Sequence, residues 1–213
     1  MPQKINSRFY PIIILALFMF TPLFVFQQLG PLDFWWWMST NLVIVISLGL
    51  VSDKAYRSEI RSDFSSGLLQ KLFIGLASAL ILYLVFYAGN QLIRILFDFA
   101  ERDISNVYRF KGDASALKIG LLMLFIIGPG EELFWRAYIQ GNMMKKFGKQ
   151  TGFLISVIIY TGIHFATGNF VLILAALTGG IFWGWMYMRY RSITANIISH
   201  IVWDISVFLL FPF

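Results

Sequence analysis

Long apolar segments follow one another along this chain of 213 residues, and they constrain its fold more than any other feature. A helix needs about 20 mainly apolar residues to cross the hydrocarbon core of a bilayer. About seven segments approach this length, with polar connectors between them: Phe9–Phe26, Phe34–Val51, Leu68–Ala88, Ala116–Ile139, Gly152–Thr167, Phe170–Met188 and Ile193–Phe211. The sequence therefore predicts an all-α, polytopic transmembrane helix bundle.

The composition excludes the other broad classes of protein. Apolar residues make up 58% of the chain and charged residues 13%, whereas a soluble domain carries about 25% charged residues. Aromatic residues reach 18%, and disordered chains are poor in them. There is no cysteine, so disulfides, a thiol nucleophile and a thiolate metal site are excluded. No repeat or linker divides the chain, which predicts one transmembrane domain over residues 1–213.

The net charge of +6 points to membrane topology rather than to nucleic acid, because the basic residues are scattered through the connectors. Cytoplasmic loops of membrane proteins are enriched in Lys and Arg. With the N-terminus inside, the inner segments hold Lys4, Arg8, Lys54, Arg57, Arg61, Lys71, Lys145, Lys146, Lys149, Arg189 and Arg191, and the outer ones hold Arg94, Arg102, Arg109, Lys111 and Lys118. We therefore expect a cytoplasmic N-terminus in a bacterial cell membrane, and an odd number of spans.

Two local patterns add detail to the predicted spans. The segment Gln91–Ala100 is amphipathic, which favours a helix lying along the membrane surface after the third span. The fourth span contains Gly128-Pro129-Gly130, which should break or kink it. A break there would expose helix N-terminal amides directly before Glu131.

Six ionisable residues lie inside apolar segments, and they include both histidines of the chain: Glu131, Glu132, Arg136, His164, His200 and Asp204. A charge at the centre of a membrane helix costs about 2.5–3.5 kcal/mol or more, so such groups usually face a bundle interior and carry function. The structural alternatives are an ion pair that only holds the fourth span and histidines that only pack. The six together favour a functional pocket.

The spacing of these residues suggests how they divide. Glu132 and Arg136 are four residues apart and can pair on one helix face, whereas Glu131 lies about 100° around the helix and points elsewhere. His200 and Asp204 are also four apart and project together from the last span. Three helices would thus offer a carboxylate, an imidazole and an imidazole–carboxylate pair to one pocket.

This inventory of groups suits hydrolysis of a peptide bond. A carboxylate in a low-dielectric pocket can act as a general base toward water, and an imidazole can assist it. Two histidines with a carboxylate are also a known zinc ligand set, although the HExxH helix of zinc proteases is missing. Spacing alone leaves metal-bound and metal-free water open.

Three short motifs in the C-terminal half, over about residues 116–211, resemble those of the CPBP family. This family comprises the type II CAAX prenyl proteases and the Abi-like bacteriocin-processing and immunity proteins. The family pattern EExxxR corresponds to Glu131–Arg136, FxxxH to Tyr160–His164 with Tyr replacing Phe, and HxxxN or HxxxD to His200–Asp204. The N-terminal half carries no matching signature.

The resemblance implies an intramembrane endopeptidase of the glutamate type. In it Glu131 activates water and His164 assists, while His200 and Asp204 line the oxyanion side of the site. Glu132 and Arg136 position the helix, with Tyr160 in support. The mechanism needs no cofactor; the alternative is zinc or another divalent metal held by Glu131, His164, His200 and Asp204.

Asp204 is the main departure from the pattern, because an ionised carboxylate would repel an oxyanion to which Asn could donate. Asp204 is either protonated, or orients His200, or helps to hold a metal. The substrates implied are membrane-associated peptides, such as the ends of prenylated proteins or peptide precursors in bacteria. The rival hypotheses are a non-catalytic immunity or scaffold protein that binds a partner through the pocket, and an ion or proton transporter.

Overall fold

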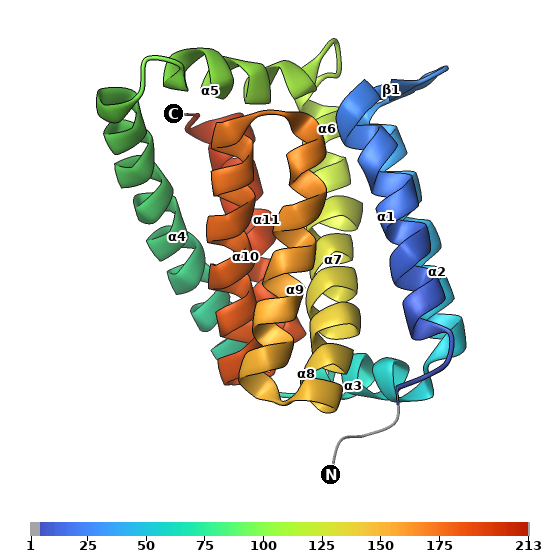
Figure 1. Ribbon diagram of the computed structural model, residues 1–213. Helices are drawn as coiled ribbons and strands as arrows, with labels where there is room; N and C mark the ends of the chain where they lie inside the picture. The colour runs from blue at the N-terminus through green and yellow to red at the C-terminus, as the bar shows by residue number, and fades with distance from the viewer. Residues whose placement is uncertain (1–4, 213) are drawn as a thin grey trace.

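The computed structural model describes residues 5–212 and confirms the all-α, polytopic class (Figure 1). The helices are α1 (Phe9–Phe26), α2 (Phe34–Ser52), α3 (Lys54–Phe64), α4 (Leu68–Leu96), α5 (Ala100–Tyr108), α6 (Ala116–Leu122), α7 (Gly128–Glu131), α8 (Gly141–Phe147), α9 (Lys149–His164), α10 (Phe170–Tyr190) and α11 (Ile193–Ile205). The one sheet in the described chain is a hairpin of β1 (Gln28–Leu29) and β2 (Leu32–Asp33), paired antiparallel between α1 and α2.

Six helical segments within residues 5–212 are long and apolar enough to cross a membrane: Phe9–Phe26, Phe34–Ser52, Leu68–Leu96, Lys149–Thr167, Phe170–Tyr190 and Ile193–Leu210. Their outward faces are apolar, as a lipid-facing surface requires. On α4, for example, Phe73 is 65% exposed and Ile95 is 80% exposed. The chain is therefore an integral, multi-pass membrane protein.

The fourth predicted span is a continuous column of helix from Ala116 to Phe147 that runs beside the other six. Gly128-Pro129-Gly130 does not break it, contrary to the sequence prediction. Two π-helical turns, Met123–Ile127 and Glu132–Gln140, flank α7, and the Gly128 amide donates to the Met123 carbonyl five residues back. The proline lacks an amide hydrogen and crowds the preceding turn, and the wide turn before it lets the column continue. No helix N-terminus therefore opens beside Glu131.

Helix α4 also differs from the prediction. It continues to Leu96 as one helix of 29 residues, so Gln91–Leu96 extends the span instead of lying along the surface. The helix that does lie across the end of the bundle is α5, which begins at Ala100 (Figure 1). Leu92, Ile93 and Leu96 line a cavity, which explains the apolar side of the amphipathic pattern.

The order of the helices gives the bundle two distinct ends. α1, α4, α9 and α11 begin at the end where α3 lies, and α2, the Ala116–Phe147 column and α10 end there (Figure 1). Most basic residues predicted for the inner side lie at this end, which we call the basic end; Lys4 lies outside the described residues. α5 and the hairpin mark the opposite end.

Candidate active site

The column that carries Glu131 and Glu132 changes its helical pitch at these two residues. Glu131 ends α7, and Glu132 begins the π-helical turns that continue to Gln140. Both side chains are buried. π-helical turns are rare and often occur at functional sites, because they re-aim side chains relative to an ordinary helix.

Glu132 is fully buried and is held by three partners. Its Oε1 accepts a hydrogen bond from His200 Nδ1 at 2.7 Å, and its Oε2 accepts one from Asn196 Nδ2 at 2.9 Å. Arg136 Nε lies 3.7 Å from the same Oε2, so the predicted ion pair is present but long. The short bonds run to α11, and Glu132 therefore ties the column to the last span.

Glu131 points to a different partner. Its Oε2 accepts a hydrogen bond of 2.9 Å from the Tyr160 hydroxyl, on α9. The Tyr160 ring also lies under the Arg136 guanidinium, with 4.5 Å from Cζ to the ring centroid. Tyr160 thus touches both the carboxylate and the cation, while within residues 5–212 Glu131 makes no hydrogen bond or ion pair with Arg136.

His164 lies one turn after Tyr160 and packs against its ring, with the centroids 4.8 Å apart. Its Nδ1 is 2.8 Å from the Tyr160 carbonyl oxygen. A carbonyl only accepts, so this contact places the ring proton on Nδ1. Nε2 is then the acceptor nitrogen, the one that could bind or deprotonate a water molecule.

His200 is fixed by its neighbours in another way. Its ring stacks on Trp183 of α10 at 3.8 Å, almost parallel, and its Nδ1 donates to Glu132. Its Nε2 lies 3.6 Å from Asp204 Oδ1, too far for a good hydrogen bond. Asp204 therefore lies beside His200 but does not fix the orientation of its ring.

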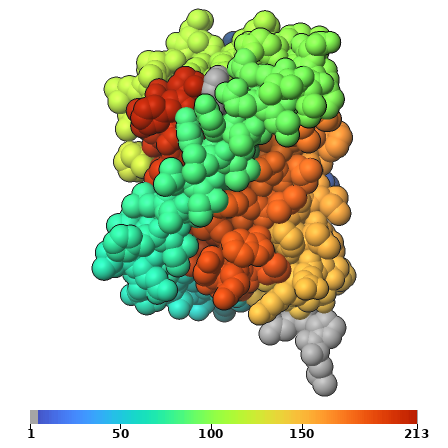
Figure 2. Space-filling model, turned by 90° about the vertical axis from the view of Figure 1, so that its left-hand side faces the viewer, coloured from blue at the N-terminus to red at the C-terminus, as the bar shows by residue number. Residues whose placement is uncertain are grey.

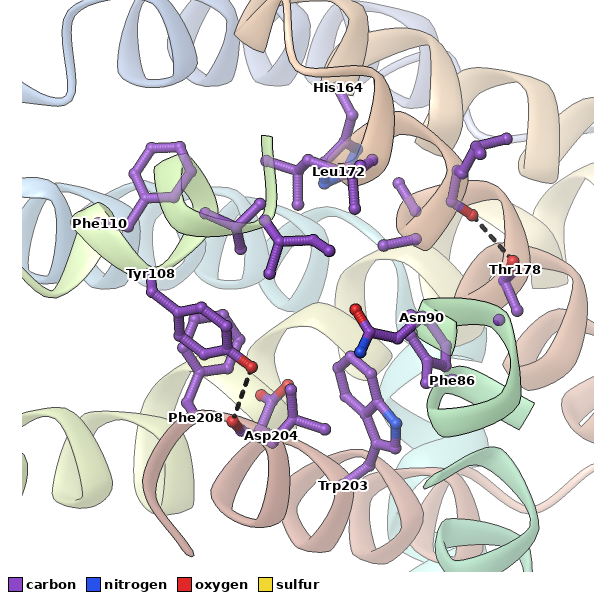
Figure 3. Close-up of a pocket in the computed structure, with 18 of the residues that line it drawn as sticks. Phe86, Asn90, Tyr108, Phe110, His164, Leu172, Thr178, Trp203, Asp204 and Phe208 are labelled. Atoms are coloured by element: carbon purple, nitrogen blue, oxygen red, sulfur yellow. Dashed lines mark hydrogen bonds between the residues drawn. The ribbon is translucent and has the colours of Figure 1, made fainter. Parts of the chain in front are cut away.

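A cavity of about 480 Å³ joins these groups. Its walls are mostly apolar, and its polar lining includes Glu131, His164, His200 and Asp204. Figure 3 shows His164 and Asp204 reaching toward this space from opposite sides, with Trp203 and Asn90 beside Asp204. A cavity of this size, apolar with a few convergent polar groups, is typical of a binding site for a small ligand or a side chain.

The seven residues singled out in the sequence, Tyr160 included, lie in one buried cluster. Contacts link them in a chain: Glu131 to Tyr160, Tyr160 to His164 and to Arg136, Arg136 to Glu132, Glu132 to His200, and His200 to Asp204. Three separate spans supply them, as expected from the spacing.

Two members of the cluster were not identified from the sequence. Asn196 is fully buried, and its Nδ2 donates to both Glu132 Oε2 and the Trp183 carbonyl. It lies four residues before His200, so the spacing that pairs His200 with Asp204 also predicts it on the same face. Trp183 gives no such signal, because a tryptophan in an apolar span looks like any lipid-facing one.

Among residues 5–212, no three His, Asp or Glu side chains are grouped closely enough to hold a metal ion. His200 Nδ1 is bound to Glu132 and His164 Nδ1 to a carbonyl, so Nε2 is the nitrogen of each ring that is left for a further partner.

Comparison with known proteins agrees with the motifs. A family model described as type II CAAX prenyl endopeptidase, Rce1-like, matches residues 113–206. No curated protein matches the chain, and no solved structure matches it. The matched region contains all seven residues of the cluster and Asn196 and Trp183 as well. Residues 113–206 are thus similar to the Rce1-like type II CAAX prenyl endopeptidase family, and the predicted resemblance is confirmed for this part of the chain.

Proposed function

We propose that the protein is an intramembrane endopeptidase in which Glu131 activates water without a metal. The observation that carries the proposal is that the Glu131 carboxylate and His164 line the same buried cavity, with Nε2 left as the acceptor nitrogen of His164. Glu132 is an unsuitable base, since both of its oxygens are occupied by partners on α11. The family match supports protease chemistry in general.

In the first step, Glu131 removes a proton from a water molecule that His164 Nε2 holds by a hydrogen bond. The resulting hydroxide adds to the carbonyl carbon of the scissile peptide bond and forms a tetrahedral oxyanion. The Glu131 carboxylic acid then gives its proton to the leaving nitrogen as the C–N bond breaks. The products are an amine and a carboxylic acid, which loses its remaining proton to solvent on release, and the Glu131 carboxylate is restored.

The oxyanion would be stabilised from α11. His200 Nδ1 is committed to Glu132, so a second proton on the ring would be on Nε2, which faces Asp204 and the cavity. A donor placed where negative charge develops is usually the largest single contribution to this kind of catalysis. Asp204 fits this role only as a neutral acid, or as a group that orients His200.

The chemistry of Asp204 can be tested by two substitutions. Asp204→Asn provides a neutral donor of the same shape, and we expect cleavage to be retained or increased. Asp204→Leu removes the polar group, and we expect cleavage to fall by about 10²–10³-fold, the scale of one oxyanion donor. Loss of cleavage in Asp204→Asn as deep as in Asp204→Leu would show that a carboxylate is needed.

The substrate class follows from the walls of the cavity. They are apolar and lie within the transmembrane region, which suits a membrane-associated peptide or the end of a prenylated protein. We further propose that the N-terminus is cytoplasmic and that the protein acts in a bacterial cell membrane, because the basic end of the bundle would then face the cytoplasm.

The central experiment compares purified wild-type protein with Glu131→Gln and His164→Ala on a library of membrane peptides in proteoliposomes. We expect Glu131→Gln to reduce cleavage by about 10²–10⁴-fold, the usual contribution of general base catalysis. Glu101→Gln is a matched control, because Glu101 is an exposed carboxylate on α5 that pairs with Arg94. Metal analysis and a chelator are applied to the same samples.

Full cleavage by Glu131→Gln would overturn the assignment of the base. Loss of wild-type cleavage on chelation, restored by a divalent metal, would overturn the metal-free mechanism. A physiological activity that persists in both variants would favour the immunity or scaffold function instead.

A further inference from the structure

The charges of the two ends of the bundle differ strongly. At the basic end, the described connectors and helix ends hold ten basic and three acidic residues: Arg8, Lys54, Arg57, Arg61, Lys71, Lys145, Lys146, Lys149, Arg189, Arg191, Asp53, Glu59 and Asp63. The opposite end holds five of each: Arg94, Arg102, Arg109, Lys111, Lys118, Asp33, Asp98, Glu101, Asp103 and Asp113. An excess of this size favours a cytoplasmic position for the basic end.

The cavity does not lie midway between these ends. Its lining comes from the C-terminal parts of α1, α4, α9 and α11 and from the N-terminal parts of α2 and α10, which are the halves of these helices away from the basic end. Residues of α5 and the turn after it also contribute, including Ile104, Tyr108 and Phe110. The catalytic groups thus form the floor of a cavity that extends only toward the end with no net charge.

Between the catalytic groups and the basic end, the helices make close contacts at glycines. A Cβ at Gly152 would lie 2.3 Å from the Met144 backbone nitrogen, and one at Gly184 would lie 2.9 Å from the Phe153 ring. A Cβ at Gly75 would lie 2.6 Å from Ile198, which shows how closely the first half of α4 packs on α11. A second cavity of about 450 Å³ lies at the basic end, but none of the residues that line it lines the first cavity.

The C-terminal half of α4 packs less closely against its neighbours. Gly89 has no atom within 4 Å of the position of a Cβ, and Gly89, Asn90 and Ile93 line the cavity together with Val171 and Leu174 of α10. Figure 2 shows α4 crossing this face diagonally, with α10 beside it. The cavity is therefore bounded toward lipid by α4 and α10 at the level where the two helices are least closely packed.

The end of the cavity is covered by α5, which is tied down. The Phe170 amide donates to Asp103 Oδ2, and Asn169 Nδ2 donates to the Asp103 carbonyl. These bonds fix α5 to the start of α10. The space between α4 and α10 offers a lateral route to the site that leaves α5 in place.

We propose that the active site takes its substrate from the extracytoplasmic half of the bilayer, through the space between α4 and α10, and that this substrate is a membrane-inserted peptide whose scissile bond lies in that half. The entry side rests on charge and packing, whereas the substrate assignment rests on the proposed endopeptidase function.

Because the chain has no cysteine, a single introduced cysteine shows which side of the membrane its position faces. Asp113→Cys and Gln150→Cys put a thiol at exposed positions on opposite ends. We expect a membrane-impermeant maleimide to label Asp113→Cys in intact cells, and Gln150→Cys only after permeabilisation. The reverse pattern would overturn the proposed side, whether or not the protein is a protease.

Two single-span reporters then test the depth of cleavage. Both carry the best-cleaved sequence from the peptide library, one in the extracytoplasmic half of the span and the other in the cytoplasmic half. We expect the first reporter to be cleaved. Cleavage of the second should not exceed the residual level measured with Glu131→Gln. Preference for the second would overturn the inference. If the labelling is as expected and neither reporter is cleaved, the endopeptidase function fails and the substrate assignment fails with it.

The route is tested by alkylation. Gly89→Cys lies at the α4 boundary of the cavity, and Gly162→Cys is a matched control on the exposed side of α9; both positions have open space around a Cβ. We expect a bulky membrane-permeant maleimide to abolish reporter cleavage by Gly89→Cys and to leave that by Gly162→Cys unchanged. Equal effects on the two variants would exclude entry between α4 and α10.

Discussion

The two halves of this bundle are built from the same helices but differ in how closely these helices pack. Toward the basic end the helices touch backbone to backbone at glycines, and buried polar groups such as Asn196 are bonded on both sides of a helix contact. Toward the other end the same helices diverge around an apolar cavity. The comparison teaches that close helix packing on one side of the catalytic groups can accompany an apolar binding space on the other.

The largest effect is expected from glycine substitutions that compare the halves. Gly152→Ala would place its methyl group 2.3 Å from the Met144 backbone, and we expect it to destabilise the protein by about 3 kcal/mol or more. Gly89→Ala meets no atom within 4 Å and should stabilise α4 by up to about 1 kcal/mol. Thermal unfolding in detergent measures both. Equal melting temperatures would show that the lower half is not the rigid one.

Substitution of one asparagine in each half tests the same difference in packing. Asn196→Ala leaves Glu132 Oε2 and the Trp183 carbonyl without a donor, which should cost about 1–3 kcal/mol. Asn90→Ala, in the cavity wall, should change stability by less than about 0.5 kcal/mol but raise KM. If Asn90→Ala proved the more destabilising of the two, the cavity wall would be part of the stable half.

Tyr160→Phe lies at the boundary between the halves. It keeps the ring under Arg136 and removes only the hydroxyl that donates to Glu131. One hydrogen bond is worth about 0.5–1.5 kcal/mol, so we expect the melting temperature to fall by a few degrees and cleavage to change by about tenfold or less. A loss as deep as that of Glu131→Gln would make the hydroxyl part of the reaction.

The smallest effect concerns Asp63, at the basic end. Burial raises the pKa of Asp63, but the hydrogen bonds from Lys71 and Thr194 outweigh it, so the pKa lies below its ordinary value. A lowered pKa stabilises the fold above the ordinary value of about 3.9, and this contribution is lost as the pH falls through the folded-state pKa.

Asp63→Asn should therefore lower the melting temperature at pH 7 by about 2 °C, the scale of a partly exposed ion pair. The difference from wild type should shrink as the solution is acidified toward pH 3. A difference that stays constant with pH would mean that the hydrogen bonds, not the charge, carry the effect.

The spans and the cluster of ionisable groups could be predicted from the sequence, because apolar length and misplaced charge are local signals. The continuation of α4 to Leu96 could not be predicted, because Gln91 and Arg94 are typical of residues at the membrane surface. Only the structure shows that their neighbours Leu92 and Ile93 face a cavity. The continuity of the column through Pro129 depends on a π-helical turn, which has no sequence signature here. Asn196 shares the four-residue spacing that joins His200 and Asp204, whereas Trp183 became recognisable only through its contacts with α11.

The π-helical turn Met123–Ile127 also has a consequence for how such a site tolerates change in length. A π turn holds one residue more than the α turn that it replaces. Deleting one residue within Met123–Ile127 could therefore be absorbed as a return to ordinary α-helix, with the turns on either side keeping their orientation relative to Glu131. The same deletion in a regular α-helical part of the column would instead rotate everything before it by about 100°. The π turn is thus the place where the column can lose a residue without turning its other residues away from the cavity.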